Sequence, residues 1–206
     1  MSERSFQKLL RKTSDYLSVH PIETVRLVLR PFEAEDFGDF QEFTSQKELR
    51  RLSGIPEYKS REEAQDAFSK LLPCRKHVPP KFAVVFRETG KVIGHFSLAV
   101  YPFLLTDPVL SQMQGLCAAF ALHESYQRRG LMTELLREAI RRLFEDCGLD
   151  YLSCGYFSFN EGSRRLQEKV GMRRYLTHPY RRGDEMLEVT EMVLFRSEYL
   201  SAERRR

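Results

Sequence analysis

The stretch Gln127-Arg128-Arg129-Gly130-Leu131-Met132-Thr133 decides the reading of this chain, because two strong patterns meet there. Residues 114–123 form an apolar run rich in small side chains, which is typical of a buried strand. Residues 131–147 place their apolar side chains on one helical face, and Gly148 suits a helix C-cap. A strand that runs into a helix exposes backbone N–H groups at the positive end of the helix dipole. The stretch therefore predicts a turn that can bind an anion, although a plain strand-to-helix turn has the same pattern.

The segments on either side extend this alternation of strands and helices. Glu88-Thr89-Gly90 separates two apolar runs, which predicts a hairpin, and Ser60 with Glu63 forms a capping box. Period-2 patterns predict strands at residues 25–30, 82–87, 91–100, 151–159, 172–180 and 185–195. Helical patterns predict helices at residues 3–18, 34–50, 60–72 and 161–170. Helices that interleave with strands, together with hairpins, predict an α/β fold with a mixed sheet flanked by helices.

Length and composition fit one globular domain with a short extension. The chain has 206 residues and a formal net charge of +4, and acidic residues separate most of the basic ones. A nucleic-acid-binding protein usually carries a denser basic stripe, so we expect no nucleic-acid partner. We expect an amphipathic helical extension at residues 1–20, the main domain at residues 21–200 and a basic tail at residues 201–206. A membrane-surface role for the first helix is the less favoured alternative.

The cysteines and the N-terminus favour a cytoplasmic protein without a metal. Cys74, Cys117, Cys147 and Cys154 form no C-x-x-C pair and no zinc-ligand spacing, so we expect no metal and interpret them as reduced core residues. The sequence has neither the apolar segment of a signal peptide nor a run of about 20 apolar residues. We therefore expect a cytoplasmic location and no membrane contact.

Three segments, in order along the chain, resemble the GNAT superfamily of N-acetyltransferases. The stretch at residues 127–133 resembles the acetyl-CoA motif of that family, which reads Gln or Arg, two residues, Gly, one residue, then Gly or Ala. Asn160-Glu161-Gly162-Ser163, followed by Glu168-Lys169-Val170-Gly171-Met172, is similar to the pattern Asn-x-x-Ser and Glu-Lys-x-Gly-Phe. Residues 26–32 with Asp36 resemble the first strand and helix. The nearest subgroup resembles the ribosomal-protein N-terminal acetyltransferases.

The resemblance implies a GNAT-like fold with a central mixed, mostly antiparallel sheet, and acetyl-CoA as cosubstrate. It implies an enzyme that acetylates a primary amine, either a protein N-terminus or a small molecule, and a homodimer is compatible with it. The acetyl-CoA site that it implies consists of Phe120, Ala121, Leu122, His123, Gln127, Arg128, Arg129, Gly130, Leu131, Met132, Thr133, Asn160, Ser163 and Arg165. Ser163 would also protonate the leaving thiolate. Asn160 and Ser163 suit helix capping equally well in their residue types, and Arg165 could be a solvated helix residue.

Three departures from the family pattern matter for the chemistry. Met132 replaces a small residue, so phosphate binding requires its side chain to point away from the ligand. Cys117 and Gln167 stand where many members carry a glutamate base and a tyrosine acid. These departures support an alternative, a catalytically silent acyl-CoA-binding sensor or interaction module.

The acid–base residues and the acceptor site stay open at this level. The candidate bases near the acetyl-CoA motif are His123, Glu124 and Glu161, and the residue pattern does not choose among them. We expect residues 44–60 and 101–113 to line the acceptor side.

Overall fold

The structure is a computed structural model that describes residues 1–73 and 80–205. The chain divides into two compact units, and each is described by itself. Unit 1 consists of Met1–Thr13, Leu98–Ala119 and Leu136–Arg206, and unit 2 of Ser14–Ser97 and Phe120–Leu135. Strand β5 (Gly115–Leu122) and helix α6 (Leu131–Glu145) each contribute residues to both units.

Unit 2 contains an antiparallel meander. Strands β1 (Ile22–Glu23), β2 (Leu27–Pro31), β3 (Lys81–Phe86) and β4 (Val92–Ala99) pair in this order. The predicted hairpin at residues 82–100 is confirmed, and Gly90 takes the left-handed φ of +71° that its tight turn requires. At the last residues of β5, the His123 N–H donates to the Ile93 carbonyl over 2.7 Å.

The helices of unit 2 are shorter than the sequence predicts. The prediction of one helix over residues 34–50 is wrong: the chain forms a 3₁₀ turn (Ala34–Asp36), α2 (Phe37–Ser45) and α3 (Lys47–Ser53). The break occurs at Gln46, whose ψ of 117° is extended, and the Gln46 side chain accepts a hydrogen bond from the Glu124 N–H. Helix α4 (Arg61–Ser69) begins as predicted, because Ser60 caps the Glu63 N–H at 3.1 Å, but ends before residue 72.

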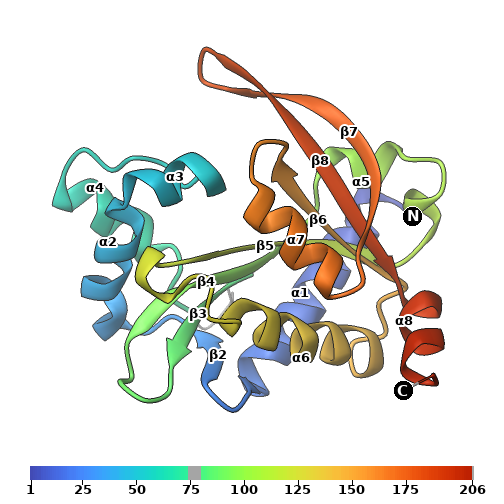
Figure 1. Cartoon of the computed structure of the whole chain (residues 1–206), viewed down its shortest axis with the longest axis horizontal. Coiled ribbons are helices and arrows are strands. Elements are labelled where there is room, and N and C mark those ends of the chain that lie inside the picture. The colour runs from blue at the N-terminus through green and yellow to red at the C-terminus, as the bar shows by residue number, and fades with distance from the viewer. Residues whose placement is uncertain (74–79, 206) are drawn as a thin grey trace. The chain divides into compact units, whose positions relative to one another are not determined.

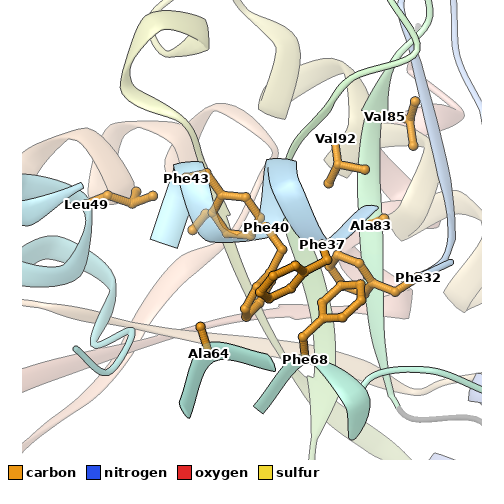
Figure 2. Packing of buried hydrophobic residues seen from close by; sticks show 11 residues of the cluster. Phe32, Phe37, Phe40, Phe43, Leu49, Ala64, Phe68, Ala83, Val85 and Val92 are labelled. Carbon is orange, nitrogen blue, oxygen red and sulfur yellow. The ribbon is translucent and has the colours of Figure 1, made fainter. Parts of the chain in front are cut away.

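An aromatic cluster forms the core of unit 2 beside α2 and α4, as Figure 2 shows. Phe32, Phe40 and Phe68 are at most 3% exposed, and their ring centroids lie 5.2–6.2 Å apart. Phe37 and Phe43 from α2 complete the cluster. Burial of these large apolar rings is the main stabilising contribution that holds α2 and α4 against the meander.

Unit 1 contains the second group of strands, drawn from green to red in Figure 1. Residues Gly115, Leu116 and Cys117 of β5 pair in parallel with Tyr151, Leu152 and Ser153 of β6 (Tyr151–Phe157). Strand β8 (Glu185–Phe195) runs antiparallel to β6 and to β7 (Arg173–Arg182), so the order is β5-β6-β8-β7. One parallel pair among antiparallel ones confirms the predicted mixed, mostly antiparallel sheet.

Helices surround these strands, including two that the sequence did not predict. Helix α7 (Glu161–Lys169) was expected, whereas α5 (Pro102–Thr106), a 3₁₀ turn (Leu110–Gln112) and α8 (Arg196–Glu203) were not. The predicted helix at residues 3–18 is confirmed as α1 (Glu3–Val19), with Phe6, Leu9 and Leu17 buried.

The described cysteines agree with their interpretation as thiols. Cys117, Cys147 and Cys154 are free, and Cys117 and Cys154 are buried. Cys74 lies outside the described residues. Among the described residues no group of acidic, histidine and cysteine side chains has the arrangement of a metal site.

Candidate functional site

The loop between β5 and α6 takes an unusual backbone conformation. After the 3₁₀ turn Glu124–Tyr126, Arg128 has a φ of +57° and Gly130 a φ of +76°. A left-handed conformation is rare for a residue such as arginine, and it persists only where the surroundings enforce it. Successive turns of this kind point neighbouring N–H groups toward one side and form an anion-binding concavity.

The N–H groups of this loop have no acceptor among residues 1–73 and 80–205. In the part of the chain that the structure describes, no hydrogen bond is found for the backbone N–H groups of residues 128–133, whereas the Glu134 N–H donates to the Gly130 carbonyl. The first N–H groups of α6 therefore lie at its positive end, where a phosphate group is the usual partner. Met132 is 6% exposed, so its side chain is buried and does not obstruct the loop.

A partly exposed ion pair attaches this loop to the residues that directly precede β2. The carboxylate of Glu134 accepts hydrogen bonds from the Thr24 hydroxyl (2.6 Å), the Arg26 N–H (2.9 Å) and the Arg26 Nε (2.7 Å). Arg26 also donates to the Arg129 carbonyl over 3.1 Å. Burial opposes ionisation of Glu134, but the hydrogen bonds from Thr24 and Arg26 outweigh it and lower the pKa of this carboxyl. Four hydrogen bonds from Thr24 and Arg26 thus fix the start of α6.

One cationic side chain of the loop packs on aromatic rings. The Arg129 guanidinium lies over the rings of Phe86 and Tyr126, with centroid distances of 5.5 and 5.4 Å. It is therefore held by cation–π contacts. Arg26 was not predicted as a site residue, yet its Nη2 lies 3.7 Å from the place where a Cβ on Gly130 would be. The sequence offers little indication of this position, because an arginine beside the apolar residues of a strand is commonly a residue at the sheet edge.

The end of β5 provides the other residues that the sequence predicted in unit 2. Ala121 and Leu122 are buried and Phe120 is half-buried. The Gln127 side-chain amide donates to the Leu122 carbonyl over 2.8 Å. The Leu122 carbonyl and the His123 N–H therefore already have partners within the protein, so a ligand beside this stretch would pair with its other backbone groups.

His123 is occupied by contacts within the protein. Its Nδ1 accepts a hydrogen bond from the Ser125 N–H, so in the neutral ring Nε2 carries the proton and faces Glu42 Oε1 at 3.2 Å. Gln46 Nε2 lies 2.9 Å from the same ring nitrogen. A buried imidazole with both nitrogens engaged positions the 3₁₀ turn and α2, and its geometry does not favour a role as the general base.

Asn160, Ser163 and Arg165 lie in unit 1, in the first turns of α7. Asn160 is the N-cap, and its Oδ1 accepts a hydrogen bond from the Ser163 N–H over 3.0 Å. Gln167 is fully buried and donates from Nε2 to the Ser163 Oγ over 3.0 Å. Because the Ser163 oxygen accepts from Gln167, its own proton is free to be directed elsewhere. The side chain of Arg165 is 76% exposed and lies 3.8 Å from Glu161.

The remaining acid–base candidates differ in their surroundings. Arg164 donates to Glu161 over 2.7 Å and lowers the pKa of that carboxyl, which makes Glu161 a poor base. Glu124 is exposed. Burial and the charge of Glu191 raise the pKa of the Cys117 thiol to about 12, so Cys117 stays protonated at neutral pH. Cys117 therefore cannot act as the missing glutamate base.

The strand–loop–helix geometry agrees with a comparison against known families. The family model of the acetyltransferase (GNAT) domain matches residues 26–173. The chain belongs to the GNAT acetyltransferase family. It is accordingly an acetyl-CoA-dependent acetyltransferase, which confirms the family and the enzyme class that the sequence resemblance implied.

Individual relatives agree with this assignment. The uncharacterized N-acetyltransferase YnaD of Bacillus subtilis is 27% identical over 153 residues, which cover 74% of this chain and 82% of YnaD. A putative ribosomal-protein-serine acetyltransferase from Vibrio cholerae superposes with a TM-score of 0.67 at 19% identity, over 86% of this chain and 98% of that one. Spermidine N-acetyltransferase from Vibrio cholerae, in complex with CoA and spermine, gives a TM-score of 0.66 at 17% identity, over 86% and 99%. At these identities the two solved structures demonstrate a shared fold alone.

The Glu134 contacts predict a stability that depends on pH. Because folding lowers the pKa of Glu134, its contribution is complete above the unfolded value of about 4.3 and is lost as the pH falls through the folded value. We expect Glu134→Gln to lower the free energy of unfolding by about 1 kcal/mol at pH 7, measured in urea. The difference from the unsubstituted protein should shrink below about pH 4. The control Glu138→Gln removes only a surface pair with Arg141 and should cost less than about 0.5 kcal/mol.

Asn160 allows its cap to be separated from any contact with acetyl-CoA. Asn160→Asp keeps an oxygen for the Ser163 N–H and removes the amide donor, whereas Asn160→Ala removes both. If Asn160 donates to the pantetheine arm, both variants should lose about 1 kcal/mol of acetyl-CoA affinity in calorimetry, and only the alanine variant should also melt earlier. Unchanged affinity in Asn160→Asp would show that Asn160 is a cap alone.

Proposed function

We propose that this chain transfers the acetyl group of acetyl-CoA to a primary amine, either a protein N-terminus or a small-molecule amine. The observation that carries the proposal is the row of backbone N–H groups at residues 128–133, which find no acceptor in the described parts of the chain and include a glycine in the left-handed region. Two similar structures support amine acceptors, since one is named for ribosomal-protein serine and the other for spermidine. Thiol release measured with a peptide and with a small amine distinguishes the two acceptor classes.

The proposed pose places the diphosphate of acetyl-CoA on the loop. The N–H groups of residues 128–133 would donate to it, and the dipole of α6 adds a partial positive charge. Gly130 permits close approach of the ligand, because the nearest atom to a Cβ there is the Arg26 guanidinium, itself a cation. Pantetheine would extend along the end of β5, and the sequence resemblance implies that Asn160 and Ser163 also contact acetyl-CoA.

The reaction requires a neutral amine, a polarised thioester and a proton for the leaving group. Acetyl-CoA supplies the activated thioester. As the amine nitrogen forms its bond to the carbonyl carbon, the C–S bond breaks and the sulfur needs a proton. Ser163 is the proposed donor, since the hydrogen bond from Gln167 occupies its oxygen and fixes its rotamer. Gln167, in the place of the family tyrosine, is thus proposed as a positioning residue.

A specific observation also favours the alternative, an acyl-CoA-binding module without catalysis. The two positions that usually supply a base and an acid carry a thiol with a raised pKa and a buried amide. Incubation of the protein with acetyl-CoA and a panel of amines separates the two functions. Thiol release with at least one amine supports the transferase, whereas tight acetyl-CoA binding without release on any amine supports the module.

Other expectations from the sequence stay predictions. They are the cytoplasmic location, the homodimer, the absence of nucleic-acid and membrane partners, and the domain boundaries at residues 20 and 200. No helix in the described parts of the chain has the length and apolarity to span a bilayer.

Substitution of Gly130 tests the phosphate loop. Gly130→Glu places bulk and negative charge against the proposed diphosphate site, and we expect acetyl-CoA affinity to fall by about 100-fold or more in calorimetry. Gly90→Glu is the matched control, because Gly90 has nearly the same φ, +71° against +76°, and open space around its Cβ. Both variants should lose about 1 kcal/mol of stability from backbone strain. Equal acetyl-CoA affinity in the two variants would refute the loop as the binding site.

Substitution of Ser163 tests the proton donor. We expect Ser163→Ala to lower kcat about 10-fold or more while KM for acetyl-CoA changes little, because the hydroxyl acts on the leaving group. Thiol release with the best amine of the panel measures both constants. Ser163→Thr retains the hydroxyl and should keep most of the activity. A kcat for Ser163→Ala equal to that of the unsubstituted protein would remove Ser163 from the reaction.

A further inference from the structure

A buried carboxylate in unit 1 has half of its hydrogen-bonding capacity unused. Glu191 lies in the otherwise apolar second half of β8, and its side chain is 6% exposed. Its Oε1 lies 3.1 Å from His178 Nε2 on β7, whereas its Oε2 is buried and has no hydrogen-bond partner in the part of the chain that the structure describes. An unpaired oxygen of a buried carboxylate is costly, so it needs a compensating function.

The sheet register directs Glu191 to the face covered by residues 101–113. Val193, two residues along β8, packs with Leu104 and Leu110. Because side chains alternate along a strand, Glu191 projects to the same face. His178 also reaches this face, with its ring 6.3 Å from that of Phe103. Residues 101–113 are a segment that the sequence predicts on the acceptor side, so the carboxylate lies where an amine would enter.

Gly155 on β6 makes room for this carboxylate. It is the strand partner of Glu191, and a Cβ at this position would lie 2.9 Å from both carboxylate oxygens. Gly155 also lies two residues beyond Ser153, the last residue of β6 that pairs with β5. The Gly155 backbone interacts with the thiol of Cys117, the position where the family pattern has a glutamate. The Glu191 carboxylate therefore occupies space beside Cys117 from a different strand.

The groups around Glu191 leave one partner that can carry positive charge. Burial raises the pKa of Tyr101 to about 12 and of Cys117 to about 12, and it raises the pKa of Cys154 well above its usual value, so all three are neutral near pH 7. Burial also raises the pKa of Glu191, while His178 lowers it. His178 Nδ1 faces the Pro179 carbonyl, which only accepts, so Nδ1 carries a proton. The contact between Nε2 and Oε1 then holds one further proton, shared by the Glu191–His178 pair.

We infer that Glu191 binds the ammonium group of the acceptor amine through Oε2 and removes its proton, with His178 as the outlet of that proton to water. This inference rests on the proposed transferase function. The ammonium gives one proton to the Glu191 carboxylate, and the neutral amine attacks the thioester carbonyl carbon. The C–N bond forms and the C–S bond breaks. The second proton that the attacking nitrogen loses as it becomes an amide reaches the thiolate through Ser163. The active form of the pair lacks the shared proton, so the Glu191 carboxyl passes the proton that it receives to the free His178 Nε2, and the imidazolium, whose side chain is 35% exposed, releases it to solvent.

The experiment compares four full-length proteins with acetyl-CoA and amine acceptors. The proteins are the unsubstituted chain, Glu191→Gln, Gly155→Ala and the control Glu188→Gln, an exposed residue of the same strand. The acceptors are spermine, a peptide with a free serine N-terminus, and benzylamine. Thiol release gives kcat and KM against pH, calorimetry gives acetyl-CoA affinity, and thermal melting reports folding.

We expect Glu191→Gln to lower kcat about 100-fold with the best acceptor, and to keep acetyl-CoA affinity within about twofold. Its melting temperature should not fall, because the glutamine retains the contact with His178 without a buried charge. Gly155→Ala should lower kcat in the same direction by displacing the carboxylate, and Glu188→Gln should leave it unchanged. In the unsubstituted protein kcat/KM should rise with pH as the Glu191 carboxyl, whose pKa burial raises, loses its proton, and Glu191→Gln should lose that limb.

Three outcomes would overturn the inference. A Glu191→Gln variant with unreduced kcat would exclude Glu191 as the base while leaving the transferase function intact. Loss of acetyl-CoA affinity and of melting temperature together in this variant would mark Glu191 as structural. Absence of turnover by the unsubstituted protein on all three amines would refute the proposed function itself, and the role of Glu191 with it.

Discussion

The carboxylate of Glu134 is the constraint on which the candidate acetyl-CoA loop depends. It accepts from Thr24 and Arg26 and thereby joins the first turn of α6 to the residues that directly precede β2, more than a hundred residues earlier. The same network supports two left-handed residues close together, Arg128 and Gly130, and such a conformation persists only where the surroundings enforce it. The N–H groups of the loop then stay unpaired without collapse onto neighbouring carbonyls. The loop is therefore preorganised, because the hydrogen bonds of Glu134 with Thr24 and Arg26, which are not ligand contacts, offset the free energy needed to order it.

Two buried polar side chains of unit 1, Gln167 and Glu191, each use only part of their hydrogen-bonding capacity. Gln167 donates to Ser163 and Glu191 contacts His178, yet Gln167 Oε1 and Glu191 Oε2 find no partner among the residues that the structure describes. In a core optimised for stability alone, apolar residues would be the better choice at such positions. Gln167 Oε1 and Glu191 Oε2 therefore mark positions where the residue present lowers stability and is explained by a role in the reaction. Both atoms lie beside groups that we propose to transfer a proton.

Much of the fold followed from sequence periodicity, and the failures have definite causes. The strand–loop–helix junction, the hairpin around Gly90 and the capping by Ser60 depend on local residues, so the sequence predicted them. The helix at residues 34–50 was wrong because the extended backbone at Gln46 is accompanied by a contact with Glu124, which is remote in sequence. The buried position of Met132 follows from the amphipathic face of α6, but the stacking of Arg129 on two rings does not. Glu191 left a signal, a lone carboxylate within the apolar run of β8, yet its meaning required His178 and Gly155 from two other strands.

The space that Gly155 leaves open makes the residue types at positions 155 and 191 depend on each other. While a carboxylate stands at residue 191, no side chain fits at residue 155 without displacing it, since a Cβ would lie 2.9 Å from both oxygens. Among relatives, a glycine at the first position should accompany an acidic residue at the second, and the two should change together. A relative with a glutamate at the position of Cys117 in β5 would not need an acidic residue at position 191. Its position 155 in β6 could then carry any residue that suits a sheet.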